Sequence, residues 1–507
     1  MAYRLFDQET YGLADQGALP LSETPTTDDI FGYRLFLEDA TSEIMVVWVD
    51  ERTGADGAQQ TLRYGTGPQN LDQSISATGD QVPSRSEYIY SVKLASLSPD
   101  TKYYLRVDAG SVIRDLTPHT TFPTALPTEG IKFVMMSDIH ITQSDGVTTP
   151  GELNPVAAEE ATALFMAGDL ADSFKEDFGS ANGAVWIDLL KNFLPVVDLP
   201  IFHAPGNHDV GNHQWDGTGS VNPDQNYYRI FFPNTAEMAP AGTNYGQVAF
   251  GNYFQMIGLD THSARPIDQR TWLEQNINTE VSAAFAIYHC PMLGVTPRDT
   301  NNLELQVRNG FYRAMRQASN LPASYAGHVH YRTRTVGLGI SESDPGTSES
   351  EQLFDADGNP DGWMVAEAGG HVEFGQGWRS GRGVSAGSQW FLEESQDDNQ
   401  YYLLTLTAQS LSVEEKEAGG TTLDTTTFTL DTEDTVTRTG TVTRDGNTVA
   451  GADVVFITRA DLLANATAQA TTDASGEYSA EIPTGEEMVG IALEGADGDS
   501  TPFTEGS

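Results

Sequence analysis

The fold is decided at Lys132-Phe-Val-Met-Met-Ser-Asp138-Ile-His140, an apolar run that ends in a carboxylate and an imidazole. Because side chains alternate along a strand, Asp138 and His140 are predicted to lie on one face. In open α/β sheets, ligands collect beyond the carboxyl ends of the strands. The stretch therefore predicts a buried strand with a candidate metal site at its end, although an Asp-x-His pair alone is more often part of an ordinary loop.

Four later stretches repeat this design of an apolar strand followed by polar side chains. Leu164-Phe-Met-Ala-Gly168-Asp169 ends in a carboxylate, which can bridge two cations, after a glycine that permits a tight approach. Ile201-Phe-His-Ala-Pro-Gly206-Asn207-His208-Asp209 offers an amide, an imidazole and a carboxylate in succession. Phe285-Ala-Ile-Tyr-His289 and Ala326-Gly327-His328-Val329-His330 end in imidazoles. The five blocks hold six of the ten histidines, which unrelated strand ends would not explain.

These five blocks, in this order, resemble the calcineurin-like metallophosphoesterase superfamily over about residues 131–410. The resemblance implies two divalent metal ions that share Asp169. Nitrogen and oxygen donors without thiolate suit Mn, Zn, Fe or similar ions, and the identity of the metal stays open. The implied ligands of the first ion are Asp138, His140, Asp169 and His330, and those of the second are Asp169, Asn207, His289 and His328.

The implied activity is hydrolysis of a phosphate monoester or diester. Two cations about 3.5–4 Å apart bind phosphoryl oxygens and supply a metal-bound hydroxide near neutral pH. The resemblance implies that His208 is not a ligand but the proton donor to the leaving group, with Asp209 orienting its ring. The motifs do not fix the substrate, and a small phosphate ester is our first expectation.

The purple acid phosphatases share the predicted domain order, a fibronectin-like domain followed by this core. They have Gly where His140 stands and a metal-binding Tyr where Asp172 stands. A tyrosinate–ferric pair is therefore not expected, and Asp172 is interpreted as a helix-start or outer residue rather than a ligand.

Other residues near the blocks have weaker signals. Arg298 and Arg332 are candidate phosphate contacts, because a guanidinium forks onto phosphate oxygens. His262 and His371 are predicted to be structural. His213, Trp215 and Asp216 follow the central block, where a pocket wall and a surface loop are equal alternatives.

The whole chain is predicted to be multidomain. After an N-terminal arm (1–30), short alternating strands over 31–124 predict a β-sandwich. Within it, Leu97-Ser-Pro-Asp-Thr-Lys-Tyr103 resembles the strand entry of fibronectin type III domains, where a tyrosine corner ties the chain to its own backbone, and Trp48 would be the core tryptophan. Residues 128–413 are predicted as the α/β metallophosphoesterase core, which the resemblance gives two packed sheets flanked by helices, with an acidic surface insertion at 341–361.

The C-terminal part is predicted as a Thr-rich linker (414–434) followed by a second β-sandwich (435–507). An Asp445-Gly446 turn signal separates two strand-like stretches there. Together with Thr472-Asp-Ala-Ser-Gly-Glu-Tyr478, it resembles the transthyretin-like, carboxypeptidase regulatory-like module. This module carries no catalytic constellation.

The composition is strongly acidic, with 72 Asp plus Glu against 27 Lys plus Arg and a formal net charge of -45. Such a charge disfavours nucleic acid as substrate except at high salt, and favours a salt-loving source because salt screens self-repulsion. Cys290 is the only cysteine, so no intramolecular disulfide can form. No signal peptide or membrane span is predicted. Location stays open between a halophile cytoplasm and an exterior or virion-associated site reached by a non-classical route.

A second hypothesis treats the protein as a structural or adhesive component of an exterior assembly, a surface layer or a virus particle. Its phosphoesterase core would then be active or vestigial. The two β-sandwich domains motivate this hypothesis, since such modules bind or space more often than they catalyse. Protein partners that bury residues 1–124 or 435–507 would favour it, and a free monomer would count against it.

Overall fold

The computed structural model describes residues 30–140, 154–170, 186–187, 190–191, 198–210, 225–234, 237, 243–293, 302–329, 332–375, 390–396 and 400–430, with short gaps inside these ranges. Beyond residue 430 it describes the backbone of strands between 435 and 502. The predicted N-terminal arm lies outside these residues, apart from Ile30. The chain divides into two compact units, Met1–Leu406 with Ser412–Thr426, and Thr407–Leu411 with Thr427–Ser507.

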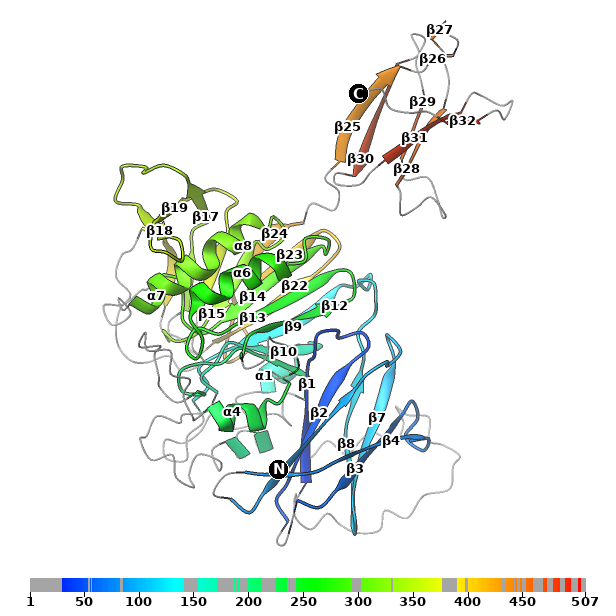
Figure 1. Cartoon of the computed structure of the whole chain (residues 1–507), viewed down its shortest axis with the longest axis vertical. Coiled ribbons are helices and arrows are strands. Elements are labelled where there is room, and N and C mark those ends of the chain that lie inside the picture. Colours follow the sequence, from blue (N-terminus) through cyan, green and yellow to red (C-terminus); the bar gives the residue numbers. More distant parts are fainter. Residues whose placement is uncertain are drawn as a thin grey trace. The chain divides into compact units, whose positions relative to one another are not determined.

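A ten-stranded sheet carries the first half of the site. Its centre is formed by β9 (Ile131–Met136), β10 (Ala163–Met166) and β11 (Ile201–His203), which run parallel, so their carboxyl ends meet at one edge (Figure 1). All three strands are almost wholly apolar, as expected for parallel strands covered on both faces. The full order is β24 (Thr422–Thr429), β23 (Ser410–Glu417), β22 (Gln400–Leu406), β9, β10, β11, β1 (Ile30–Leu35), β2 (Ile44–Asp50), β6 (Tyr88–Leu94) and β5 (Asp80–Gln81).

The N-terminal β domain continues this sheet. Strand β1 pairs parallel with β11 through Leu35 and Ile201 on one side, and antiparallel with β2 on the other. Side chains reinforce the junction, since the Tyr33 hydroxyl donates to the Phe231 carbonyl at 2.6 Å. The two domains are therefore joined by backbone pairing. The remaining strands of this domain form a four-stranded sheet in the order β4 (Gln73–Ala77), β3 (Gln60–Gly65), β7 (Lys102–Ala109) and β8 (Val112–Thr120).

A seven-stranded sheet carries the second half of the site and packs against the first sheet. Phe133 and Phe165 of the first sheet meet Phe250 and Phe254 of the second, with ring centroids of Phe133 and Phe254 only 5.0 Å apart. The predicted pair of packed sheets is thus present. The order of the second sheet is β12 (Gly246–Phe250), β13 (Phe254–Leu259), β14 (Ala283–Tyr288), β15 (Ala323–Ala326), β20 (Val372–Gly375), β16 (Arg332–Thr335) and β21 (Leu392–Gln396).

Helices cover the outer face of the second sheet. α6 begins with Pro266 in its first turn, where the missing N–H costs nothing, and it buries Leu273. Leu273 joins a buried cluster with Tyr288 of the sheet and Phe311 of a π-helical turn. Among the described helices none is long and apolar enough to span a bilayer. The helices are α1 (Asn154–Ala157), α4 (Gln225–Phe231), α6 (Pro266–Asn276), α7 (Asn302–Val307), η2 (Arg308–Tyr312) and α8 (Arg313–Gln317).

Two segments differ from their sequence-based descriptions. The segment 414–434, predicted as linker, contains the end of β23 and all of β24, which lengthen the first sheet. Threonine favours strands without supplying the apolar alternation that marks them in a sequence. The acidic insertion at 341–361 contains β18 (Ser350–Phe354) and the loops on either side of it, and β18 belongs to a small sheet with β17 (Leu338–Ser341) and β19 (Pro360–Ala366).

Beyond Leu430, every residue whose backbone is described lies in a strand. The pairings there are antiparallel, as in β28 with β29 and β31. The strands are β25 (Thr435–Thr441), β26 (Thr443–Arg444), β27 (Asn447–Thr448), β28 (Asp453–Thr458), β29 (Ala468–Thr471), β30 (Glu477–Pro483), β31 (Met488–Leu493) and β32 (Ser500–Pro502).

Candidate metal centre

The candidate ligands lie directly after five strands of the two sheets. In the first sheet they follow the parallel strands β9, β10 and β11, and in the second they follow the parallel strands β14 and β15. Except for the half-buried His328, every side chain of the set is at most 7% exposed. The structure therefore brings together these predicted site residues: Asp138, His140, Asp169, Asn207, His208, Asp209, His289 and His328.

The Asp169 carboxylate lies at the centre of the group. Its Oδ2 is 3.7 Å from Nε2 of His140 and 3.1 Å from Nε2 of His289. Asp138 joins from the same edge, with Oδ1 3.7 Å from His140 Nε2, and accepts the backbone N–H of His328 at 2.9 Å. Ligand-capable atoms of Asp169 belong to two clusters, one with His140 and His208 and one with Asp138 and His289.

Several atoms that can bind a cation converge between the two sheets. His289 Nδ1 lies 2.7 Å from the Ala167 carbonyl, which can only accept, so this nitrogen carries the hydrogen. In the neutral ring, the lone pair of His289 Nε2 therefore faces Asn207 Oδ1 at 3.1 Å. The same amide oxygen lies 3.0 Å from His328 Nδ1. Two imidazole nitrogens thus each lie within hydrogen-bond distance of one amide oxygen, and imidazole, amide and carboxylate donors suit a divalent transition metal.

The pKa values of Asp169 and His289 are set by the closeness of carboxylates and imidazoles in this group. Burial opposes ionisation of the Asp169 carboxyl, but the imidazoles of His289 and His208 hold its pKa well below the ordinary value. Burial alone would lower the pKa of His289, whereas the carboxylates of Asp169 and Asp138 raise it to about 9. Without a metal the site thus holds a proton where a cation would bind, and metal uptake should release it.

The backbone at the candidate ligands is held in an unfavourable conformation. Asp138, His140, Asp169 and His328 all have positive φ values, of 54°, 48°, 54° and 73°. Non-glycine residues with positive φ are uncommon, and such strain tends to accumulate at functional sites. Four of them around one carboxylate indicate that the surrounding structure is built to hold these side chains in place.

Gly168 permits the close approach of the loops. Its φ is 87°, and a Cβ atom there would lie 2.5 Å from the Gly206 nitrogen and 2.7 Å from His289 Nδ1. Both distances are shorter than real Cβ contacts. The prediction that a glycine is needed before Asp169 is therefore supported by the packing.

Asp209 fastens two of the loops together. Its Oδ2 accepts the backbone N–H groups of Asp169 and Gly206 at 2.8 and 2.9 Å, and its Oδ1 accepts that of Leu170 at 2.9 Å. Both oxygens are thus engaged with backbone amides. The sequence assigned this carboxylate to the His208 ring, but the geometry favours a role in shaping the loops that carry Asp169 and Asn207.

His208 lies beside the first candidate ligands. Its ring meets that of His140 edge-on with centroids 4.5 Å apart, and its Nε2 is 3.8 Å from Asp169 Oδ2. Its backbone N–H donates to Asp169 Oδ1 at 2.8 Å. The position of the His208 ring suits either a metal ligand or a proton donor to the leaving group.

Sequence reasoning missed two features of this region. His262, predicted as structural, lies after β13 with its ring centroid 5.2 Å from that of His289. The signal was the polar end of an apolar strand, Asp260-Thr261-His262, but it belongs to none of the recognised blocks. Burial and the neighbouring His289 and His328 lower the pKa of His262 well below its ordinary value, so its ring is neutral. His203, which had no assigned role, bonds through Nδ1 to the Tyr228 hydroxyl at 2.7 Å.

Several predicted residues cannot be placed at the centre. Arg332 is only 2% exposed and forms an ion pair with the buried Glu415 at 3.3 Å, so its interpretation as a phosphate contact finds no support. The remainder lie outside the described residues: His330, Asp172, His213, Trp215, Asp216 and Arg298.

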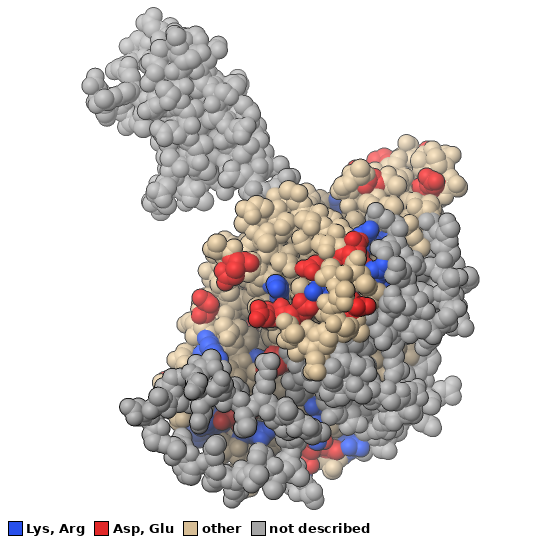
Figure 2. Space-filling model, turned by 180° about the vertical axis from the view of Figure 1, so that it is seen from behind, with Lys and Arg blue, Asp and Glu red and all other residues tan. Residues whose placement is uncertain are grey.

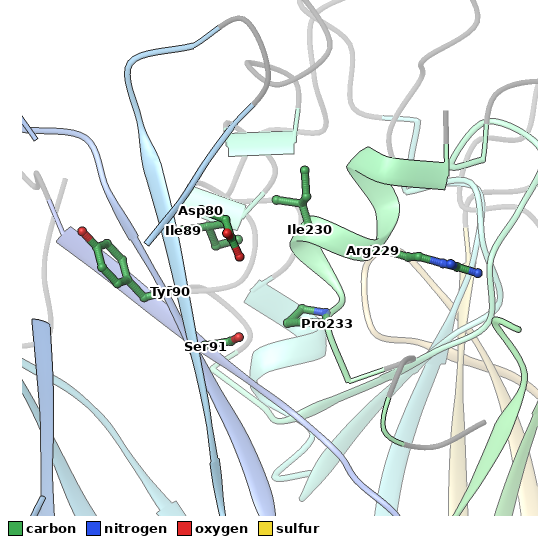
Figure 3. Close-up of a pocket in the computed structure, with 7 residues that line it drawn as sticks. All are labelled: Asp80, Ile89, Tyr90, Ser91, Arg229, Ile230 and Pro233. Atoms are coloured by element: carbon green, nitrogen blue, oxygen red, sulfur yellow. The ribbon is translucent and has the colours of Figure 1, made fainter. Parts of the chain in front are cut away.

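A separate cavity of about 290 Å³ lies between the N-terminal β domain and α4 (Figure 3). None of the candidate ligands lines it. Figure 3 shows Arg229 pointing away from the other labelled side chains, and its Nε donates to Asn244 at 3.2 Å. With one carboxylate and few other polar groups, this cavity lacks the donors of the metal centre. Its lining is Asp80, Ile89, Tyr90, Ser91, Arg229, Ile230 and Pro233.

Comparison with known proteins gives two family matches. Residues 31–124 match the N-terminal domain of purple acid phosphatases, and residues 131–332 match the calcineurin-like phosphoesterases. A curated relative, phosphoenolpyruvate phosphatase from Allium cepa, is 22% identical over 306 residues. The match covers 58% of this chain and spans 60% of the length of that relative.

Two solved structures also align. One is a predicted phosphoesterase from Streptococcus pneumoniae, 10% identical, covering 59% of this chain and 97% of its own, with a TM-score of 0.24. The other is Vps29 from Chaetomium thermophilum, 10% identical, covering 60% of this chain and 96% of its own, with a TM-score of 0.21. The hypothesis of a structural component in an exterior assembly gains no support from any of these matches.

Proposed function

We propose that the chain is a metallophosphoesterase of the calcineurin-like superfamily, in the domain order of the purple acid phosphatases, and that it hydrolyses phosphate esters at a dinuclear metal centre. The observation that carries the proposal is the convergence of acceptor atoms around Asp169 and Asn207, from both sheets. These atoms are of the types that bind divalent transition metals.

The proposed ligands divide around Asp169. Its two carboxylate oxygens let it serve both ions, with Asp138 and His140 completing the first set and Asn207, His289 and His328 the second. His330 would complete the first set, as the family resemblance implies. When bound, two divalent ions polarise a phosphoryl group and lower the pKa of a water molecule.

Residues of the chain itself hold the proposed ligands in place and supply protons. The Ala167 carbonyl fixes the tautomer of His289, which keeps its Nε2 available as a donor atom. Asp209 holds the loops of Asp169 and Gly206 at a fixed separation. We assign His208 the transfer of a proton to the departing oxygen of the ester, because its ring lies at the edge of the ligand group.

A small phosphate monoester is the proposed substrate class. The name of the Allium cepa relative refers to such an ester, phosphoenolpyruvate. The net charge of -45 works against long polyanions, which repel the protein unless salt screens the charges. Phosphoenolpyruvate and aryl phosphates are therefore the first substrates to test, with a diester as comparison.

Metal analysis coupled to hydrolysis tests the proposal. We expect about two divalent ions in the full-length protein. We expect release of phosphate from phosphoenolpyruvate, loss of the activity in a chelator, and its return with Mn²⁺ or Zn²⁺. Protein that retains its metal but hydrolyses neither monoesters nor diesters would refute the enzymatic role. Protein that binds no divalent ion would refute the metal centre.

The His208→Ala variant separates its two candidate roles. As a proton donor, His208 should be worth roughly 10²–10⁴-fold in kcat for an alkyl phosphate. Its contribution to kcat should be much smaller for a nitrophenyl phosphate, because the leaving group of this ester needs no proton. The metal content should equal that of wild type. Loss of one ion, with equal rate losses for both esters, would instead identify His208 as a ligand.

We further propose that the N-terminal domain is a fibronectin III-like sandwich. Two contacts support this reading. The Tyr103 hydroxyl accepts the backbone N–H of Ser98 at 2.8 Å, as in a tyrosine corner, and the fully buried Trp48 stacks on Tyr90. For the strands between 435 and 502 we propose the carboxypeptidase regulatory-like sandwich. Backbone NMR of the isolated segment 435–507 would test it, since an unfolded segment would count against an independent domain.

A further inference from the structure

His262 is a buried imidazole for which the described residues supply no hydrogen-bond partner. It follows β13 and is 2% exposed. Across the part of the chain that the structure describes, neither of its ring nitrogens has a partner. A neutral imidazole carries one donor and one acceptor, and leaving both unpaired away from water costs free energy. The ring therefore lacks an interaction that a bound group would supply.

The turn that carries His262 is firmly built. Asp260 Oδ1 accepts the backbone N–H groups of His262 and Ser263 at 2.9 and 2.8 Å. Gln269 of α6 holds Asp260 in turn, through the Asp260 N–H at 3.0 Å. The hydroxyl of Thr261 accepts the N–H of Cys290 at 3.1 Å. This last bond connects the turn to the residue that follows His289, so the two imidazoles are held together by the backbone.

The ring of His262 closes a triangle with two proposed ligands. Its centroid is 5.2 Å from that of His289 and 5.6 Å from that of His328, while these two lie 5.1 Å apart. One nitrogen from each ring lies within 4.8 Å of one nitrogen from each of the others. Three imidazoles at such spacing can contract onto one transition-metal ion, for which nitrogen distances of about 2.0–2.1 Å are typical of zinc.

Burial without a partner would not by itself identify a ligand, as His119 illustrates. That imidazole is 1% exposed, and its ring nitrogens also lack partners among the described residues. It belongs to none of the ligand-capable clusters found in these residues, whereas His262 shares one with His289 and His328. The distinguishing feature of His262 is therefore its place beside two candidate ligands.

We propose that His262 is an additional ligand of the ion held by Asn207, His289 and His328, which gives that ion three imidazole donors. The inference rests on the metal centre of the proposed function. It extends the ligand set by a residue outside the five sequence blocks. If Asp169 is counted for both ions, the second ion would have five protein ligands and the first ion would have four. The two ions should therefore differ in affinity, the second being the tighter.

The test is metal binding by the full-length protein rather than its turnover. Co²⁺ is the probe, because its visible absorption changes with the ligand set, and a competing chelator gives the affinity of each equivalent. His262→Phe keeps a buried aromatic ring but removes both nitrogens. It should weaken one Co²⁺ equivalent by at least about tenfold, since loss of even an outer partner of a ligand costs 10–100-fold. The absorption band of that equivalent should change, and the other equivalent should bind as in wild type.

Two further variants keep the test decisive. His262→Gln offers an amide oxygen in place of a ring nitrogen, so it should recover part of the affinity with an altered band. It also carries the test if His262→Phe does not fold. His119→Phe makes the same change at an equally buried imidazole, and its Co²⁺ binding should equal that of wild type.

A failure of the His262 proposal can be distinguished from a failure of the proposed function. Wild-type affinity and an unchanged spectrum in His262→Phe would overturn the ligand role and leave the metal centre intact. An equal loss of affinity in His119→Phe would also overturn it, by attributing the effect to general destabilisation. A wild-type protein that binds no Co²⁺ would instead overturn the proposed function.

Discussion

At the scale of single residues, Gly168 is where the centre tolerates least change. Replacing it by alanine adds a Cβ against the Gly206 nitrogen and His289 Nδ1, at a φ of 87°. We expect Gly168→Ala to lose metal affinity and to lower the free energy of unfolding by more than the about 1–2 kcal/mol that a left-handed alanine costs alone. Urea unfolding of the metal-free protein, together with metal analysis, measures both effects.

Gly110 provides the matched control for this substitution. Its φ is 76°, but a Cβ there would have nothing within 4 Å. Gly110→Ala should therefore cost only the backbone term and leave metal binding unchanged. If Gly168→Ala proved as mild as Gly110→Ala and fully metal-loaded, the close packing of the two loops would not matter to the centre.

The candidate ligands that the structure brings together were recognisable in the sequence, because they come soon after the ends of five apolar strands. The contacts that these residues make could not be predicted from the sequence. The position of Asp209 beside His208 in the chain suggested a ring contact, whereas both of its oxygens are engaged with backbone amides. His262 was predicted to be structural, and its closeness to His289 and His328 was not visible because these residues lie far along the chain.

At the scale of strands, β14 and β20 share a buried carboxyl that makes stability depend on pH. Burial raises the pKa of Glu373 from 4.5 to about 7, against hydrogen bonds from the Met292 N–H and the Tyr288 hydroxyl. The folded state thus binds this proton more tightly than the unfolded state. The contribution is fully present below pH 4.5 and is lost as the pH rises to about 7, by on the order of 3 kcal/mol.

Glu373→Gln imitates the protonated acid and should remove this dependence. Relative to wild type, the variant should gain stability between pH 5 and pH 8, because only the wild-type carboxyl must ionise while buried. Chemical unfolding of both proteins across that range measures the difference. A difference that stays constant with pH would show that Glu373 does not carry the proposed proton.

Strand β24 shows where prediction of elements failed. Its sequence, Thr-Leu-Asp-Thr-Thr-Thr-Phe-Thr, contains two large apolar residues, and its side chains alternate only between exposed and half-buried. It lies at the edge of the sheet, where one neighbour suffices. Central strands such as β9 and β14 were predictable because burial on both faces demands continuous apolar runs.

At the scale of the whole molecule, the N-terminal domain and the core should unfold together. Phe122, 4% exposed, packs between Phe36 of the first domain and Phe250 of the core, with ring centroids 5.7 and 4.7 Å away. Phe122→Ala should lower the free energy of unfolding by about 3–5 kcal/mol. Calorimetry should show the transitions of both domains moving down together.

The control is Ile113→Ala, since Ile113 is 65% exposed in the same domain. It should change stability by no more than about 0.5 kcal/mol. A variant at Phe122 that lost only a low-temperature transition, with the core unaffected, would mean that the N-terminal domain is an independent spacer.

The acidic surface should make stability depend on salt. Figure 2 shows Asp and Glu side chains, interspersed with Lys and Arg, over the described part of one face. At a net charge of -45, raising sodium chloride from 0.1 to 1 M shortens the Debye length from about 10 to about 3 Å and weakens self-repulsion. We expect Tm to rise, whereas a Tm that falls or stays level would show that the repulsion is offset elsewhere.

The general architecture was predictable, whereas the continuity of the first sheet was not. Domain order and the pair of sheets followed from the motifs and the resemblance that they carry. The pairing of Leu35 with Ile201 depends on two strands that carry no local sign of each other. A pattern of apolar residues predicts that a strand exists, but not which distant strand will lie beside it.

The shared sheet also has a consequence during synthesis on the ribosome. Tyr33 finds its partner Phe231 only 198 positions later. At about 5–20 residues per second, the nascent chain would present the open edge of β1 for roughly 10–40 s. An unpaired edge invites pairing with other chains. The N-terminal domain therefore cannot complete its sheet until the core has been synthesised. Growth conditions that slow translation should increase co-translational aggregation of this protein.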